Sequence, residues 1–409
     1  MKQNRAAILF FLVFAFISCI PISSFAEQVT TSDRVESGVN IREAASSNGP
    51  VIGVLSKGDK LKFVESVPYW HKVLLNDGRE GYVSKSWTVL IPDSPESPSS
   101  IPFAVHFVDV GTGDAIIIDM GDKEIVIDGG ESTTVLADYV KRVGLIDGPI
   151  ELVVVTHGDS DHWKGLARLL GTDGVLDAPY AALEFWEPGY DRDCNSSSDT
   201  GRASYLDFIN SVKTKVPAGG FKRPLEHFHA PAVTSNNPQS ITLNTISHAK
   251  ITVLHTDSTP SGNSCSYQIN NAAIVMKVEI DGIKFLFTGD ANGKERDENS
   301  PGTPKYVEKL LLDLERNNPG LLKADVLKVP HHGSETASTQ AYIDAVNPKY
   351  AIISASTRHH LPKDTVINRY TNSQRVILRT DTNRESNKDH IVCAKREGQV
   401  YCNYADIYE

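Results

Sequence analysis

The chain has 409 residues, of which 40% are hydrophobic and 22% charged, and this composition excludes a disordered or collagen-like protein. It predicts a soluble globular protein with more than one domain. The 41 Lys and Arg against 51 Asp and Glu give a net charge of -10, which excludes a global positive field that would attract nucleic acid or an anionic membrane. A nucleic-acid substrate would therefore require a local basic groove.

The N-terminus predicts a signal peptide over residues 1–26. Lys2 and Arg5 precede an apolar run over residues 6–20, and Ser24-Phe25-Ala26 provides the small residues of a cleavage site. We therefore expect an exported protein, periplasmic or secreted. Cys19 offers lipid anchoring as the alternative, although the leucine usual three residues before such a cysteine is absent. No later stretch approaches the roughly 18 apolar residues of a membrane-spanning helix, so we expect none in the mature chain.

Four of the five cysteines lie beyond the predicted signal peptide, and an oxidising compartment allows an even number to pair. Cys393 and Cys402 flank Glu397-Gly398 symmetrically, which predicts a hairpin with a disulfide across its strands. That pairing leaves Cys194 to Cys265. The alternative is that one or both pairs are free buried thiols.

Residues 92–102 are rich in proline and serine and predict an interdomain linker. Before them, short alternating segments separated by Gly, Asn, Asp and Ser predict a small all-β unit. Residues 30–91 resemble a bacterial SH3 (SH3b) domain in Val39-Asn40-Ile41-Arg42-Glu43-Ala44, Trp70-His71-Lys72-Val73 and Asp77-Gly78-Arg79-Glu80-Gly81-Tyr82-Val83. The resemblance implies cell-wall or substrate targeting through peptidoglycan, and the alternative is a spacer without a ligand.

After the linker, strand-like apolar runs alternate with helical stretches, which predicts an α/β layered domain over residues 103–409. The expected helices include Thr133–Val143 and Pro304–Asn317. The expected strands are Ala115–Ile118, Ile125–Ile127, Leu152–Val155, Ile251–Leu254, Ala273–Val278, Phe285–Phe287, Val326–Val329 and Tyr350–Ile353.

Several of these strands end in residue types that bind metals. Leu152–Val155 leads into His157-Gly158-Asp159-Ser160-Asp161-His162, and Phe285–Phe287 leads into Gly289-Asp290. A lone Gly-Asp or His-His pair is more often a turn or a surface feature. Four candidate ligands within six residues are different, because buried carboxylates require a charge partner and a metal supplies one. If the strand ends meet at one edge of the sheet, these groups converge there.

At this point the sequence resembles the metallo-β-lactamase fold, and within it the ComEC-type hydrolases, from about Phe103 to Asp381. The matching motifs are His106-Phe107-Val108-Asp109-Val110-Gly111-Thr112-Gly113-Asp114-Ala115, Ile127-Asp128-Gly129-Gly130, Thr156-His157-Gly158-Asp159-Ser160-Asp161-His162, Phe287-Thr288-Gly289-Asp290 and Leu327-Lys328-Val329-Pro330-His331-His332-Gly333-Ser334. The resemblance implies an αββα sandwich and two divalent metal ions, with Zn first and Mn or Fe as alternatives.

Carried over by motif, the resemblance implies a set of seven metal ligands: His157, Asp159, Asp161, His162, Asp290, His332 and His360. One ion would take His157, Asp159 and a member of the His331–His332 pair, for which we favour His332. The other would take Asp161, His162 and a later histidine, for which we favour His360, and Asp290 would be shared.

The same resemblance assigns catalysis to Asp161, Asp290 and His331, the last as an acid or a phosphate contact. We interpret Asp109, Asp114 and Asp128 as structural residues that fix turns behind the site.

The remaining histidines, His71, His227, His229, His248 and His255, are interpreted as non-ligands, with His255 as the reserve because it follows a predicted strand. Asn270, Asn271 and Lys164 are candidates for polar contacts to a phosphate, with a turn as the alternative role of the asparagines. Lys213, Lys215, Lys222 and Arg223 cluster in the sequence and are candidates to line a local basic groove, with a solvated charged face as the more common alternative.

Hydrolysis is the reaction that two close metal ions favour, because they activate water and clamp the attacking and leaving oxygens. A phosphodiester is the leading substrate class, with nucleic acid or wall-linked phosphate polymers as examples. The alternatives are a metal hydrolase of a lactam, lactone or thioester, and a catalytically silent wall-binding protein. Asp159 in place of the usual histidine argues against the lactamase branch.

Overall fold

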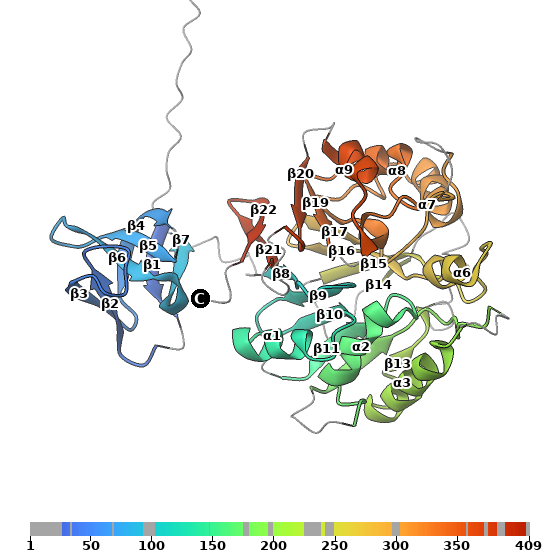
Figure 1. Cartoon of the computed structure of the whole chain (residues 1–409), viewed down its shortest axis with the longest axis horizontal. Helices are drawn as coiled ribbons and strands as arrows, with labels where there is room; N and C mark the ends of the chain where they lie inside the picture. The colour runs from blue at the N-terminus through green and yellow to red at the C-terminus, as the bar shows by residue number, and fades with distance from the viewer. Residues whose placement is uncertain are drawn as a thin grey trace, which may run out of the picture. The chain divides into compact units, whose positions relative to one another are not determined.

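Figure 1 shows the computed structural model of the chain. The structure describes residues 27–32, 35–67, 69–92, 103–146, 148–174, 180–194, 199–224, 239–241, 249–296, 303–356, 359–371, 375–382 and 389–405. The predicted signal peptide, residues 93–102 of the predicted linker, and His227, His229 and His248 lie outside the described residues. The chain divides into two compact units, Met1–Ser99 and Ser100–Tyr408.

The first unit is a seven-stranded sheet with the order β3-β2-β6-β5-β4-β1-β7. Its strands are β1 (Glu27–Thr31), β2 (Gly38–Arg42), β3 (Val51–Ser56), β4 (Lys60–Val67), β5 (Trp70–Leu74), β6 (Glu80–Ser84) and β7 (Thr88–Pro92), with the 3-10 helix η1 (Lys85–Trp87) before β7. Alternate residues of these strands, such as Val39, Ile41, Val73 and Val83, point into one small core. The predicted small all-β unit is confirmed, and Pro92 ends β7 instead of opening the linker.

The second unit contains two sheets. The first has the order β13-β12-β11-β10-β9-β8-β21-β22. Its strands are β8 (Ala104–Phe107), β9 (Ala115–Asp119), β10 (Glu124–Gly129), β11 (Ile150–Val154), β12 (Ala182–Trp186), β13 (Phe221–Lys222), β21 (Ile391–Arg396) and β22 (Gln399–Tyr404).

The second sheet has the order β14-β15-β16-β17-β18-β19-β20. Its strands are β14 (Gln239–Ile241), β15 (Ala249–His255), β16 (Val275–Ile280), β17 (Ile283–Phe287), β18 (Val326–Lys328), β19 (Tyr350–Ile353) and β20 (Val376–Arg379). In each sheet the strands that lead into the metal-ligand motifs are parallel neighbours: β10 pairs with β11, and β17 pairs with β18. Their carboxyl ends therefore lie at one edge of each sheet.

In the second unit, helices cover the outer face of each of the two sheets, as Figure 1 shows. The helices are α1 (Val135–Val143), α2 (Ser160–Leu169), α3 (Arg202–Lys215), α6 (Cys265–Asn271), α7 (Tyr306–Asn317), α8 (Gln340–Val346) and α9 (Asp364–Thr371), with the 3-10 helix η2 (Pro330–Gly333) after β18. None of the helices in the described part of the chain is long and apolar enough to cross a membrane.

Alternation along the strands builds three apolar layers. On β9, Ile116 and Ile118 face the core between the two sheets, whereas Ile117 faces α1 and α2. On β18, Val326 faces the central core and Leu327 faces α7 and α8. Residues of both sheets share the central core, so the architecture is the expected αββα sandwich.

Both predicted cysteine pairings are confirmed. Cys393 lies opposite Cys402 in the β21–β22 hairpin, and the two form a disulfide. Glu397 and Gly398 both have positive φ, 51° and 76°, as a two-residue turn between twisted strands requires. Cys194 and Cys265 form the second disulfide, which spans 71 residues of sequence.

Candidate metal centre

The centre is assembled from loops at the ends of both sheets. The loop after β11 carries His157 and Asp159 and continues into α2, whose first turn carries Asp161 and His162. The second sheet supplies Asp290 after β17 and the His331–His332 pair in η2 after β18. His331 and His332 both have left-handed backbones, with φ of 50° and 52°. This conformation is uncommon outside glycine and marks a locally constrained backbone.

Asp290 lies among the imidazole rings of His157, His162 and His332, and the imidazole of His331 is a fourth, 3.8 Å away. Its Oδ1 is 3.4 Å from Nε2 of His162 and 3.3 Å from Nε2 of His332, and its Oδ2 is 3.9 Å from Nε2 of His157. Asp161 Oδ2 lies 3.6 Å from Nε2 of His332. One carboxylate from the second sheet is thus placed between ligand candidates of both sheets.

The same three imidazoles turn their other nitrogen to an oxygen. Nδ1 of His162 donates to Asp128 Oδ2 at 2.8 Å, and Nδ1 of His332 donates to the carbonyl of Ser354 at 2.8 Å. His157 Nδ1 contacts Thr156 Oγ1 at 3.1 Å, and that hydroxyl donates to Asp128. These contacts select the tautomer whose Nε2 lone pair faces the centre, as in histidines that bind metals. Asp128 also accepts from the backbone N–H of Thr156 and holds the turn, as expected.

Buried polar atoms without hydrogen-bond partners show whether the site suits a metal ion. Nε2 of His157, His162 and His332 and Oδ1 of Asp290 are buried, and within the described structure none has a hydrogen-bond partner. Leaving one such group unpaired costs about 1–3 kcal/mol. Four of them in one place are explained by a cation. Four sets of candidate ligand atoms within 4.8 Å of one another lie there: His157, His162 and Asp290; Asp161, His162 and His332; Asp114, Asp290 and His332; and Asp114, Asp128 and His162.

The electrostatics agree with a site built for cations. Burial alone would lower the pKa of His332, but Asp290 and Asp114 raise it to about 10. Burial likewise opposes protonation of His162, yet Asp290, Asp128 and Asp161 raise its pKa well above the usual value. Burial alone would raise the pKa of Asp290, but the neighbouring histidines hold it well below the usual range. Without metal, protons therefore take the place of cations at this centre.

The predicted ligands differ in how closely they approach the centre. Asp159 directs Oδ2 toward Nε2 of His157 at 3.8 Å, and burial together with Asp161 raises its pKa to about 6. His332 groups with Asp161 and His162, not with His157 and Asp159 as in the expected division of ligands. His360 is exposed and joins none of the ligand groups found among the described residues. Its role as a ligand remains a prediction to which this arrangement adds no support.

His331 lies beside the ligands. Asn270 Nδ2 donates to its Nε2 at 3.4 Å, and its Nδ1 contacts Thr336 Oγ1 at 2.7 Å and Asn292 Oδ1 at 3.2 Å. Its Nε2 is 3.8 Å from Asp290 Oδ2, and burial lowers its pKa. His255, the reserve ligand, instead contacts the carbonyl of Asn271 at 2.9 Å and stands outside these groups.

Asp114 and Lys328 were not predicted to be part of the centre. Asp114, interpreted as structural, places Oδ1 3.3 Å from Nδ1 of His332 and pairs through Oδ2 with the ammonium of Lys328. Both side chains are almost fully buried. Lys328 was the available signal, because a lysine within an apolar strand requires a buried acidic partner.

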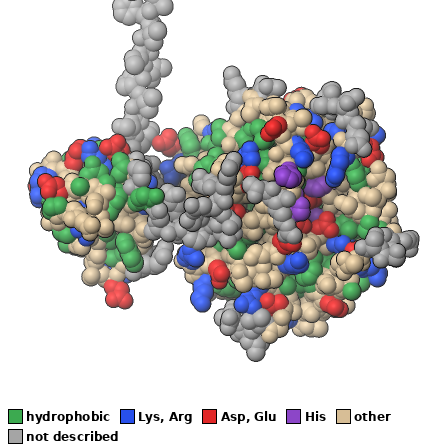
Figure 2. Space-filling model, in the orientation of Figure 1, with side chains coloured by type: hydrophobic (Ala, Val, Ile, Leu, Met, Phe, Trp, Pro, Cys, Tyr) green, Lys and Arg blue, Asp and Glu red, His purple; other side chains and the backbone are tan. Residues whose placement is uncertain are grey.

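A cavity of about 320 Å³ opens over the ligands. Its lining residues are Thr112, Glu131, Asp159, Ser160, Asp161, Ser266, Asn270, Asp290, His331, His332, His359 and Leu361. Figure 2 shows histidine side chains beside acidic ones on this face of the molecule. None of the described residues that line the cavity is Lys or Arg. Lys164 instead lies 3.8 Å from Glu131, and Asn271 bonds Ser261 and Asn292.

The basic residues that were candidates for a groove contact other groups of their own region. Lys215 donates to the carbonyl of Gly171 at 2.7 Å, and Lys222 pairs with Glu184 at 2.7 Å. Arg223 pairs with Asp191 at 2.8 Å, and Lys213 lies over the ring of Phe221. Within the described part of the chain, Lys222 and Arg223 are thus paired with carboxylates, whereas Lys213 and Lys215 keep their positive charge.

Comparison with known families agrees with this geometry. Residues 108–245 match the metallo-β-lactamase superfamily, and residues 37–89 match the bacterial SH3 domain. The chain carries a bacterial SH3 domain followed by a metallo-β-lactamase domain. The match to that superfamily supports a metal-dependent hydrolase, and the described residues include groups that could hold a metal ion.

The curated relatives of this chain are competence proteins of the expected ComEC type. The chain is 34% identical over 116 residues to ComE operon protein 3 of Bacillus subtilis, covering 28% of this chain and 13% of that protein. It is 32% identical over 114 residues to competence protein ComA of Neisseria gonorrhoeae, covering 27% and 14% respectively. The matches thus span less than a sixth of either relative.

Among solved structures, the metallo-β-lactamase fold protein YhfI of Bacillus subtilis aligns with 74% of this chain and 100% of its own, at 12% identity and a TM-score of 0.38. A putative zinc-dependent hydrolase of the same superfamily from Thermotoga maritima aligns with 67% of this chain and 98% of its own, at 14% identity and a TM-score of 0.29.

Proposed function

We propose that this chain is an exported hydrolase that uses two divalent cations to cleave phosphodiester bonds. The observation that carries the proposal is the convergence of three buried imidazole nitrogens, from His157, His162 and His332, on the carboxylate of Asp290. Such a cluster is costly in a folded protein unless a cation or proton satisfies it.

The residues that would hold the cations are His157, Asp159, Asp161, His162, Asp290 and His332. Three imidazoles and three carboxylates suit Zn²⁺, and the oxygen-rich part of the set also suits Mn²⁺ or Fe. Bound there, two divalent cations would supply an acidified water and positive charge for a phosphodiester.

The chain's own residues would complete the chemistry. His331 borders the cavity and is held from behind by Thr336 and Asn292, so its Nε2 would accept a proton from the attacking water and pass it to the departing oxygen. Asn270 and Ser266, both on α6, line the same cavity and would donate to phosphate oxygens. Asp161 and Asp290 would hold the ligand geometry from opposite sheets.

We propose a phosphodiester over a neutral acyl substrate because two bound divalent cations would suit its distributed negative charge. The described lining of the cavity carries Glu131, Asp159, Asp161 and Asp290 and no lysine or arginine, so the positive charge that attracts the substrate would have to come from those cations. The competence proteins among the relatives make nucleic acid one substrate to test.

The test is a panel of substrates offered to the metal-loaded, full-length protein. We expect hydrolysis of bis(p-nitrophenyl) phosphate or a short single-stranded oligonucleotide, and no hydrolysis by the chelated protein. Faster turnover of nitrocefin, a lactone or a thioester would contradict the phosphodiester assignment. No turnover of any of them by a protein loaded with two ions would favour a silent binding protein.

For the SH3b domain we propose a targeting role through a cavity of about 490 Å³. It is lined by Trp70 and the half-exposed Trp87, with Arg42 and Glu36 supplying opposite charges. Aromatic faces with a few polar groups suit a glycan or peptide ligand, so peptidoglycan is the partner to test. A spacer would bind no such ligand.

A further inference from the structure

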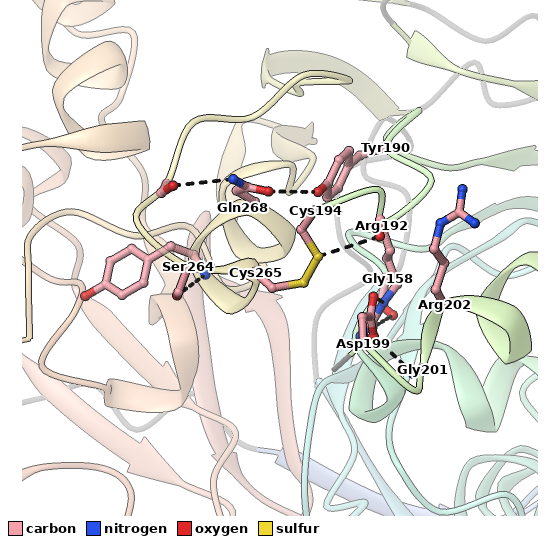
Figure 3. The surroundings of a disulfide bond; sticks show 12 residues. Gly158, Tyr190, Arg192, Cys194, Asp199, Gly201, Arg202, Ser264, Cys265 and Gln268 are labelled. Atoms are coloured by element: carbon pink, nitrogen blue, oxygen red, sulfur yellow. Dashed lines mark hydrogen bonds and ion pairs between the residues drawn. A yellow bond between two sulfur atoms is a disulfide. The ribbon is translucent and has the colours of Figure 1, made fainter. Parts of the chain in front are cut away.

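The loop after β12, residues 187–194, joins the two halves of the metal centre. Its Cys194 forms the disulfide with Cys265 at the start of α6, with 5.2 Å between the Cα atoms (Figure 3). Tyr190 adds a second link, because its hydroxyl donates to Gln268 Oε1 at 3.1 Å and its ring packs against Ile269. The loop leaves the first sheet, whereas α6 precedes β16 of the second sheet.

Arg192 extends from this loop to residues 157–162, which carry four predicted ligands and are called the metal loop below. Its Nη1 donates to the carbonyl of Gly158 at 2.5 Å and to Asp159 Oδ1 at 2.9 Å. Its Nε and Nη2 donate to the two carboxylate oxygens of Asp199 at 3.0 and 2.6 Å. The guanidinium is therefore fixed by hydrogen bonds to Asp199 on one side and to the metal loop on the other. Arg192 is only 8% exposed.

Arg192 packs closely against two glycines. A Cβ at Gly158 would lie 3.0 Å from Cγ and Cδ of Arg192, and a Cβ at Gly201 would lie 2.9 Å from its Nη2. Two glycines thus permit the close approach of the arginine to the metal loop. Figure 3 shows Arg192, Asp199, Gly158 and Gly201 together beside the disulfide.

We infer that Arg192 is a positioning residue that presents Asp159 to a cation, and that the Cys194–Cys265 disulfide holds Arg192 in place to do so. By occupying Oδ1 of Asp159, the guanidinium leaves Oδ2 for the cation, and Oδ2 is the oxygen that faces Nε2 of His157. The inference rests on the metal centre of the proposed function and is independent of its substrate. It makes metal loading dependent on formation of one of the two disulfides.

The first test compares arginine variants of the oxidised full-length protein. Arg192→Met should lower the affinity for one of two cations by about 10–100-fold, the usual cost of losing a residue that hydrogen-bonds a ligand. Chelator competition with Zn²⁺ measures the affinity, and the visible spectrum of the Co²⁺ protein should change because the ligand field changes. Arg192→Lys should restore part of the affinity. In an Asp159→Asn background, Arg192→Met should cost little more.

Arg223→Met is the matched control. It removes an arginine that pairs with Glu187 and Asp191 of the same loop, where Arg192 pairs with Asp159 and Asp199. We expect its metal affinity and Co²⁺ spectrum to match wild type. Equal losses in both variants would show that the loop acts only by general stability, and unchanged affinity in Arg192→Met would also overturn the inference.

The second test compares the two disulfides. The double variant Cys194→Ala/Cys265→Ala should lose affinity for the same ion, by no more than Arg192→Met does, whereas Cys393→Ala/Cys402→Ala should keep it. Equal affinity in the two double variants would overturn the coupling. If wild type binds two cations and Arg192→Met binds them equally well, only this inference fails. If folded wild type binds none, the proposed function fails and this inference fails with it.

Discussion

Oδ1 of Asp290 lies 3.3 Å from Nε2 of His332, and both side chains are buried. The two residues are 42 positions apart, but they follow β17 and β18, which are parallel neighbours. The contact therefore follows from strand order, because neighbouring parallel strands release their loops at the same edge. His162 reaches the same oxygen from the other sheet, at 3.4 Å.

Asp290→Ala should abolish metal binding and hydrolysis, because it removes the carboxylate that lies among three imidazoles. The loss of affinity should exceed the roughly 10–100-fold cost of losing a residue that only supports a ligand. Metal analysis after dialysis and p-nitrophenol release measure the two effects, and the SH3b domain should remain folded. Asp313→Ala, which removes an acid from α7, serves as the control and should behave as wild type. Full activity in Asp290→Ala would contradict the two-metal account.

Asp128→Asn should weaken metal binding by about 10–100-fold without removing a ligand. The side-chain oxygen of the asparagine can still accept from the N–H of Thr156, as Oδ1 of Asp128 does. The amide nitrogen that replaces Oδ2 cannot accept the hydrogen bonds from His162 Nδ1 and Thr156 Oγ1. His162 then loses the bond that fixes its tautomer. Chelator competition gives the affinity, with Asp325→Asn as a control because Asp325 also accepts a backbone N–H, from Lys284. An unchanged affinity in Asp128→Asn would show that Asp128 only shapes the turn.

Metal binding should release protons and strengthen as pH rises. Neighbouring carboxylates raise the pKa of His332 to about 10 and that of His162 well above its usual value, so both imidazoles are protonated in the metal-free protein at neutral pH. A cation must displace those protons, and its affinity should rise about tenfold per pH unit for each proton displaced. Calorimetry between pH 6.5 and 8.5 in buffers of different ionisation enthalpy counts the protons. A pH-independent affinity would contradict the assignment of these imidazoles as ligands.

Lys328→Met should destabilise the metallo-β-lactamase domain by up to about 3–5 kcal/mol, because it leaves the buried carboxylate of Asp114 with His332 as its remaining charged neighbour. Adding Asp114→Asn should recover part of this loss, since the incompletely balanced charge is then removed. Urea unfolding of the metal-free proteins measures both free energies. A double variant less stable than Lys328→Met would show that Asp114 contributes to stability without Lys328.

Trp87→Ala should weaken binding of the full-length protein to insoluble peptidoglycan at least about fivefold, the cost of losing an interface tryptophan worth more than about 1 kcal/mol. Tyr69→Ala is the matched control, because Tyr69 is 53% exposed on the same domain and does not line the cavity. Sedimentation with washed sacculi measures the bound fraction. Equal binding by wild type and Trp87→Ala would favour the spacer.

The layered fold could be predicted because its strands are apolar runs bounded by turn residues. Val326–Val329 and Phe285–Phe287 lie within or next to β18 and β17. The predicted strand Ala273–Val278 begins later, at Val275, because Ala273 bonds back to Asn270 at the end of α6. Helix and strand ends depend on such local bonds, which hydrophobic patterns do not encode.

The centre could be predicted only in part. His157, Asp161 and His162 stand close together in sequence, so their spacing suggested a shared site. Asp114 and Arg192 reach the centre through long-range packing, and no periodic pattern distinguishes them from other polar loop residues. His360 was assigned from the family motif alone, and its role as a ligand stays a prediction, since its side chain is exposed and joins no ligand group among the described residues.

The most direct test of the central claim is the metal content of the purified, disulfide-bonded full-length protein, measured after chelation and reloading. We predict two tightly held divalent ions per chain in wild type and fewer than one in Asp290→Ala. A folded wild-type protein that binds no ion after reloading would contradict the account, and the SH3b domain would then be the place to look for function.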